Sequence, residues 1–294
     1  MSDMVWKFCG NPVSQSQLEL IEELVEDYGN FSRTELAATV CEVLGWLRPN
    51  RNPKTVECAD FLSTLHEAGV IELPASRQGR VKGSKNIVRR TRKGDAEAVL
   101  QTTLEAVTPL EFHRMNRGDR RLEIWKEYID RFHYLGYKVP FGAQIRYLVT
   151  TPALDGRPLA CLQFSSPAWR LKDRDAWIGW SDERRQANLQ SIVQNSRFLI
   201  LPWVRIPHLA SHVLSLALKR VARDWEETFA VKPLLVETFV DERFEGACYK
   251  AANWLRLGQT QGRGRMDRYH EQAAGTKSLW IFPLCKNPQS ALKQ

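Results

Sequence analysis

The spacing of hydrophobic residues near the start of the chain predicts short amphipathic helices. Leu18, Ile21 and Leu24 recur at helical spacing, which indicates a helix with one buried face. Ser32, followed three residues later by Glu35, forms the capping-box pattern that opens a helix. We therefore expect two consecutive helices before residue 45.

A third helix is predicted over residues 54–67, and the segment VIELP at 70–74 that follows it has the composition of a strand. Three short helices, tight turns and a strand are typical of a winged helix-turn-helix, with 54–67 as the recognition helix. A small helical bundle that only packs or dimerises would show the same pattern. We predict a helix-turn-helix DNA-binding module over residues 1–76.

From about residue 107 the pattern changes to alternating strands and helices. Strands are expected at 108–115, 144–151, 157–164, 197–204, 233–240, 255–262 and 278–284, and helices at 119–132, 211–229 and 246–254. An Asp155–Gly156 turn between two of these strands is a hairpin signal. This order predicts an α/β domain with a mixed sheet over residues 107–294, joined to the first module by a connector at 77–106.

The composition is typical of a globular protein, and the chain carries a net positive charge. The 294 residues are 43% hydrophobic and 26% charged, values typical of folded proteins, and the formal net charge is +8. No apolar run approaches the roughly 18 residues of a membrane span, and the N-terminus lacks a secretory pattern. We expect a cytoplasmic protein with no membrane partner.

The positive charge is concentrated in the connector. Eight cations occur before the first acid at Asp95, namely Arg77, Arg80, Lys82, Lys85, Arg89, Arg90, Arg92 and Lys93. Such a run would neutralise the phosphates of a nucleic acid, with DNA favoured, without reading its sequence. A solvated linker is the alternative.

The order of elements in the second domain resembles the GNAT acyltransferase fold. Several segments are similar to the Druantia anti-phage protein DruA family: FHYLGY at 132–137, QIRYLV at 144–149, DAWIGW at 175–180, NSRFLILPWV at 195–204, LLVETFVD at 234–241 and YKAANWLRLGQTQGRGR at 249–265. A more distant likeness joins the last segment to the Mom-type DNA-modifying proteins of phages. The resemblance implies DNA transactions in phage defence, with partners such as a helicase, but no single reaction. The expected architecture is a winged-helix-like module followed by a GNAT-like mixed-sheet α/β domain.

The turn that would hold the pyrophosphate of acetyl-CoA in a GNAT enzyme corresponds to RIPHLASH at 205–212. It has no glycine, and Pro207 removes a backbone donor, so acetyl-CoA is not expected to bind. His208 and His212 are interpreted as surface or capping residues. The cofactor is therefore unknown, although a divalent metal is compatible with the acids described next.

Three residues are candidates for catalysis. Glu237 and Asp241 lie four apart on one predicted strand face, where two acids act as acid and base or hold a divalent ion. Alternatively, Asp241 caps the next helix and Glu237 pairs with an arginine. Tyr249 matches the position of a general acid in the GNAT fold, or it packs on the sheet. His133 is interpreted as compensating a helix dipole.

Two further segments are candidates for nucleic-acid contacts. GQTQGRGR at 258–265 combines glycines, which allow close backbone approach, with Gln259, Arg263 and Arg265. Arg170, Lys172 and Arg174 are interleaved with tryptophans, a combination that binds strands without sequence preference. A solvated loop and core tryptophans are the respective alternatives.

These observations favour a nucleic-acid-binding protein of anti-phage defence. One alternative is an enzyme, either a Mom-like modifier of DNA bases or a metal-dependent nuclease built on Glu237 and Asp241. Another is a scaffold that recruits a defence helicase.

Overall fold

The structure is a computed structural model that describes residues 6–28, 32–48, 52–74, 88–116, 118–138, 143–260 and 275–294. The chain divides into two compact units, Met1–Lys85 and Asn86–Gln294. Each unit has its own hydrophobic core, so each is described by itself.

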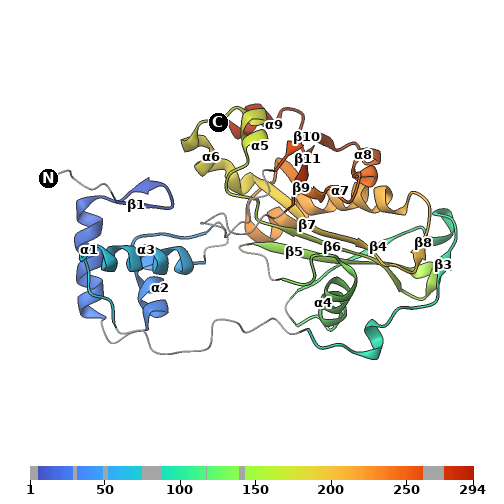
Figure 1. Ribbon diagram of the computed structural model, residues 1–294, viewed down its shortest axis with the longest axis horizontal. Coiled ribbons are helices and arrows are strands. Elements are labelled where there is room, and N and C mark those ends of the chain that lie inside the picture. Colours follow the sequence, from blue (N-terminus) through green and yellow to red (C-terminus); the bar gives the residue numbers. More distant parts are fainter. Residues whose placement is uncertain are drawn as a thin grey trace. The chain divides into compact units, whose positions relative to one another are not determined.

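The described residues of the first unit form three helices and a short hairpin (Figure 1). Its elements are β1 (Lys7–Phe8), β2 (Asn11–Pro12), α1 (Gln15–Asp27), α2 (Arg33–Val43) and α3 (Thr55–Glu67). Both of the first two helices start with a capping box, Ser14 with Gln17 and Ser32 with Glu35. The hydrophobic stripes of all three helices meet in one core. The three predicted helices are therefore present.

The predicted strand at 70–74 is wrong. Residues 71–74 form no strand, because Ile71 and Leu73 are buried against the helices. The Leu73 N–H donates to Nδ1 of His66 at 3.3 Å, and so does not pair with a neighbouring strand. The helix-turn-helix interpretation of this unit stays a prediction.

The second unit contains the remaining elements (Figure 1). They are η1 (Arg92–Gly94), β3 (Leu100–Gln101), η2 (Glu105–Val107), β4 (Glu111–Arg114), α4 (Arg121–Phe132), β5 (Gln144–Thr151), η3 (Pro152–Leu154), β6 (Arg157–Ser165), α5 (Lys172–Ile178), α6 (Asp182–Asn188), η4 (Leu189–Ser191), β7 (Ile192–Ile200), β8 (Val204–Arg205), α7 (Leu209–Phe229), β9 (Leu235–Asp241), α8 (Ala247–Ala251), β10 (Leu255–Gln259), β11 (Lys277–Pro283) and α9 (Pro288–Leu292).

A seven-stranded sheet organises this unit, in the order β10-β11-β9-β7-β6-β5-β4. Neighbouring strands are antiparallel except for β7 and β9, which are parallel. The prediction of a mixed-sheet α/β fold is confirmed. The chain reverses between β5 and β6 through Asp155 and Gly156, which have φ values of 52° and 74°, so the predicted turn is also present.

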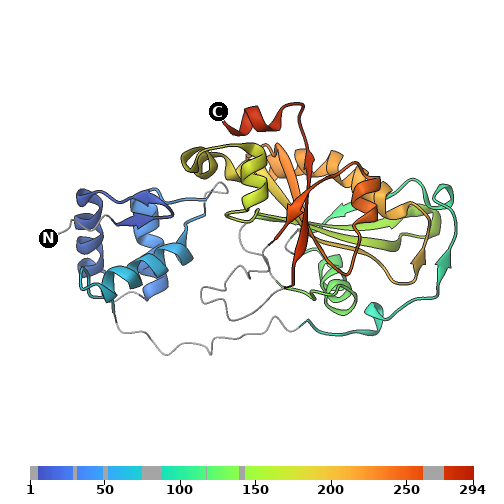
Figure 2. The same ribbon diagram turned by 45° about the horizontal axis from the view of Figure 1, so that its top comes forward.

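Helices cover both faces of the sheet. In the two views α4 lies on one face, while α7 and α8 lie together on the other. Helix α7 buries the stripe that contains Val213, Ala217 and Val221, because these residues recur every four positions. Figure 2 shows α9 beside α5 and α6, where Leu292 and Ile178 share a small core cluster. No helix in the described parts of the chain is long and apolar enough to cross a membrane.

Candidate functional site at the ends of strands β7 and β9

The parallel pairing of β7 and β9 is short. It spans three residue pairs and ends at Gln194 opposite Glu237. On its other side, β7 carries a bulge at Ser196, since Asn195 pairs with Phe164 but Arg197 pairs with Gln163. A bulge bends a strand and commonly ends its pairing. Beyond Gln194, side chains therefore connect the two strands.

A buried polar cluster forms that connection. The Thr238 hydroxyl donates to the Asn195 carbonyl at 2.9 Å, and the Tyr249 hydroxyl donates to Oδ1 of Asn195 at 2.9 Å. The amide nitrogen of Asn195 donates to the Gln163 carbonyl at 3.1 Å. All four residues are buried. A buried network with satisfied partners makes the local geometry rigid.

Helix α8 places Tyr249 in this cluster. It begins after Gly246, whose φ of 71° favours glycine and whose added Cβ would lie 2.8 Å from the Trp280 ring. Burial raises the pKa of Tyr249, so the phenol stays protonated and acts as a donor. Its proton points to Asn195. A general-acid role for Tyr249 stays a prediction.

Glu237 is part of a fully buried ion pair. Its Oε2 accepts from Nη1 of Arg174 at 2.9 Å, and its Oε1 accepts from the Ala168 N–H at 2.9 Å. Both charged side chains are 0% exposed. Arg174 was predicted to lie on a nucleic-acid surface, and this is wrong because it compensates the buried charge of Glu237.

Asp241 lies at the far end of β9. Four residues along a strand correspond to about 13 Å, so Asp241 and Glu237 do not share an ion or a proton, despite lying on one face. Asp241 accepts from Nε of Arg243 at 2.7 Å, and this bond lowers its pKa. It does not cap α8, whose N-cap is Gly246. Catalytic roles for the two acids stay predictions that their separation does not support.

The end of β9 is surrounded by cations that sequence reasoning missed. Arg197 donates to the carbonyls of Gly136 and Ser196 at 3.2 and 2.7 Å, and no described acid pairs with it. Lys277 lies opposite Asp241 in the antiparallel ladder of β11 and β9. The polar run at 194–197, inside an otherwise apolar strand, is the sequence signal that marks this place.

His133 lies beside these cations. Burial, followed by the charges of Arg197 and Lys277, lowers the pKa of His133 to about 4, so the ring is neutral near pH 7. Its Nδ1 accepts from the Leu135 N–H at 3.2 Å. A neutral acceptor does not compensate a helix dipole, so His133 does not have the role that the sequence predicted for it.

Exposed aromatic rings adjoin the same cations. Tyr134 is 40% exposed and Phe244 53% exposed, and their ring centroids are 5.6 Å apart. The Arg243 guanidinium lies 4.8 Å from the Tyr134 centroid and 5.9 Å from that of Phe244. Rings and cations therefore share one surface.

The last residues of the basic connector pack against helix α4 of the second unit. The Thr91 N–H and hydroxyl donate to the two carboxylate oxygens of Glu127 on α4, at 2.7 and 2.9 Å. A Cβ at Gly94 would lie 2.2 Å from Glu127, so glycine permits this close approach. Arg131 adds an ion pair with Asp95 at 2.8 Å. The end of the connector is thus held against α4.

The other residues predicted to contact nucleic acid are exposed where the structure describes them. Arg89, Arg90, Arg92 and Lys93 are exposed, and within the described ranges no acid pairs with them. Arg170 is exposed but pairs with Asp182, Lys172 is exposed, and Gln259 is exposed while its backbone N–H donates to Asp173. Six further predicted residues lie outside the described ranges, namely Arg77, Arg80, Lys82, Lys85, Arg263 and Arg265.

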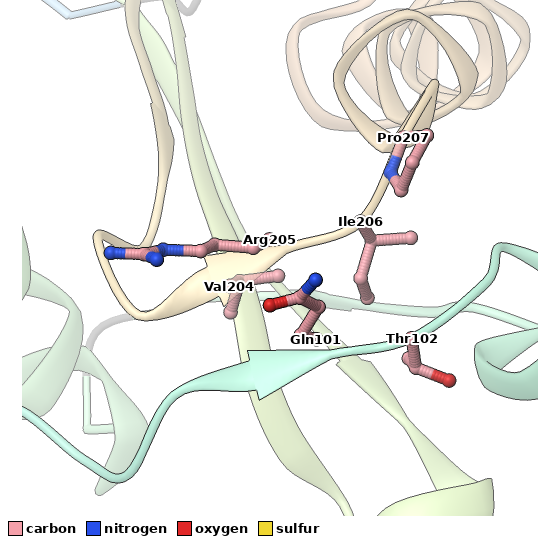
Figure 3. Close-up of a pocket in the computed structure, with 6 residues that line it drawn as sticks. All are labelled: Gln101, Thr102, Val204, Arg205, Ile206 and Pro207. Carbon is pink, nitrogen blue, oxygen red and sulfur yellow. The ribbon is translucent and has the colours of Figure 1, made fainter.

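The turn before α7 borders a surface pocket (Figure 3). The pocket is lined by Gln101, Thr102, Val204, Arg205, Ile206 and Pro207. Strand β8 holds this turn in parallel against β3, and His208 precedes α7 with a φ of 64°. That acetyl-CoA does not bind here stays a prediction. In the parts of the chain that the structure describes, no group of three His, Cys, Asp or Glu side chains is arranged to hold a metal ion.

Comparison with known proteins gives a family and distant structural likenesses. A family described as Druantia protein DruA matches residues 64–292. No curated protein matches the sequence.

Among solved structures, spermidine N-acetyltransferase from Vibrio cholerae is similar at 10% identity and a TM-score of 0.39, with 63% of this chain and 98% of that chain covered. An aminoglycoside acetyltransferase is similar at 11% identity and a TM-score of 0.39, with 63% and 99% covered. For the ribosomal-protein-S5-alanine acetyltransferase from Vibrio fischeri, the identity is 7%, the TM-score 0.32 and the coverage 48% and 61%. Similarity at this level says nothing about substrate or cofactor.

Proposed function

Because the chain belongs to the family of Druantia protein DruA, we propose that it binds DNA in anti-phage defence. Membership in this family supports the defence role. The observation that carries DNA binding is the set of four exposed cations at the end of the connector, Arg89, Arg90, Arg92 and Lys93, for which no acid partner is described.

The anchoring of this segment supports a binding role rather than that of a solvated linker. The bonds from Thr91 to Glu127 and the close contact of Gly94 hold their backbone against α4. A segment that is already ordered loses less conformational entropy when it binds a partner. Clustered cations neutralise DNA phosphates and release condensed counterions, which gives affinity without sequence readout.

The test is the salt dependence of duplex binding by the full chain. We expect log Kd to depend linearly on log salt concentration, and replacing Arg89, Arg90, Arg92 and Lys93 together by Ala to reduce the slope by about 3.6. The matched control replaces four exposed lysines elsewhere on the second unit, Lys232, Lys250, Lys286 and Lys293, by Ala. Equal slopes for the two variants would contradict a specific role for the anchored segment.

The remaining functional hypotheses stay predictions of the sequence. They are a DNA contact through the helix-turn-helix of the first unit, a helicase or other defence protein as partner, and a DNA-modifying or nuclease activity. Nucleoside mass spectrometry of phage DNA incubated with the protein, with and without divalent metal, would detect base modification, and gel analysis of the same DNA would detect cleavage.

A further inference from the structure

The surface beside the end of β9 combines exposed rings with charges that its own acids do not neutralise. We call Tyr134, Arg197, Arg243, Phe244 and Lys277 the aromatic–cationic surface. These residues come from the turn after α4, from β7, from the turn after β9 and from β11. The fold therefore brings together four segments that are distant in the sequence.

The rings are exposed although they contact each other. Phe244 is 53% exposed and Tyr134 is 40% exposed, with 5.6 Å between their centroids. Single exposed apolar residues are ordinary, whereas adjoining exposed rings next to charges mark a binding surface. The two rings are inclined by 51°, and Tyr134 already contacts the stacked His133 ring and the Arg243 guanidinium, each 4.8 Å from its centroid. Phe244 therefore offers the more open ring face.

The charges on this surface favour an anion. The acid Asp241 is already bonded to Arg243, and the nearby Glu242 accepts from the Thr276 hydroxyl at 2.7 Å. Arg197 has only carbonyl partners among the described residues. Lys277 has no described ion pair. Three cations thus face two acids, and Arg197 and Lys277 are both partly exposed without a described acid partner.

We propose that the aromatic–cationic surface binds an unpaired nucleotide of single-stranded DNA. The base stacks on Phe244, beside Tyr134, and the adjacent phosphates contact Arg197 and Lys277. Bases inside a duplex present no free face, so ring stacking selects a strand that is already unpaired or a base that has been extruded. This inference rests on the proposed DNA binding and specifies the form of DNA that this surface takes.

Fluorescence anisotropy of the full chain with labelled single-stranded and duplex DNA tests the stacking. We expect Phe244→Ala to weaken single-strand binding roughly five-fold or more, as loss of one stacked base does, and to leave duplex binding unchanged. Phe244→Trp should retain single-strand binding because it keeps a π face. The matched control is Leu255→Ala, which truncates a 47% exposed apolar residue on β10. Equal effects of Phe244→Ala and Leu255→Ala would overturn the proposal.

Two further measurements separate this surface from the anchored segment. Lys277→Gln should lower the salt slope for single-stranded DNA by about 0.7 and leave the duplex slope unchanged. Photo-cross-linking of iodouracil-containing single strands should label peptides that contain Tyr134 or Phe244, and labelling confined to other peptides would overturn the proposal. Binding of duplex without single strands would overturn this inference alone. Absence of binding to either form would overturn the proposed function as well.

Discussion

Strand β9 carries two acids on one face, and each is bonded to an arginine in a different environment. At the paired end, Glu237 and Arg174 are 2.9 Å apart and both 0% exposed. At the end that extends beyond the pairing with β7, which we call the free end, Asp241 and Arg243 are 2.7 Å apart, with side chains 16% and 61% exposed. The chemistry of the two pairs is nearly identical, and only their burial differs.

Burial determines what each pair does. A buried charge that loses its partner is left uncompensated in a medium of low dielectric constant, so Glu237 and Arg174 must remain paired in the folded chain. An exposed pair contributes little to stability because water screens it. Asp241 and Arg243 are accordingly free to respond to a ligand, and the free end of β9 is where we place DNA.

Removing the buried acid should have the largest effect. We expect Glu237→Gln to reduce the free energy of unfolding by about 3 kcal/mol, since the buried Arg174 then keeps only its ion pair with the partly exposed Asp175. Urea denaturation measures the loss. Arg174→Met combined with Glu237→Leu removes both charges and should be less destabilising than Glu237→Gln. A loss of less than about 1 kcal/mol in the free energy of unfolding for Glu237→Gln would contradict the stabilising role of this pair.

A second prediction uses pH and concerns the neutral ring of His133. The pKa of this ring is about 4 in the folded chain, against an ordinary value of 6.5. Between these values the unfolded chain binds a proton that the folded chain does not, so stability is full above pH 6.5 and decreases as the pH falls toward 4. The loss is on the order of 2 kcal/mol at a pH of about 4.5.

The matched variant for this prediction is His133→Asn, which offers an acceptor to the Leu135 N–H without titrating. Urea denaturation at several pH values should show a smaller loss on acidification for the variant than for the natural chain. The other titratable groups ionise in both proteins, so the difference between the two pH profiles reports His133. Identical pH profiles would contradict the depressed pKa.

The sequence predicted elements better than it predicted the site. Periodicity identified β5, α7 and β9 because buried stripes and alternations are local patterns. It failed at 70–74, where burial against helices replaced strand pairing. The burial of Arg174 depends on Glu237, 63 positions away, and no local pattern reports such a contact. A shared site for Glu237 and Asp241 followed from their common face, but a strand separates residues four apart by about 13 Å.

The smallest expected effect concerns Asp241. Asp241→Asn keeps an acceptor for the Arg243 N–H and Nε, so its unfolding free energy should change by less than about 1 kcal/mol. Removing one negative charge beside Lys277 and Arg197 should strengthen single-stranded DNA binding on the order of two- to three-fold. Glu226→Gln makes the same charge change at an exposed position on α7 and should have no such effect. If Asp241→Asn folds and binds DNA but abolishes protection against phage, Asp241 is a catalytic residue. If the Asp241→Asn variant retains protection and binds DNA more tightly, the free end of β9 acts by holding DNA, whereas the buried pair acts only in stability.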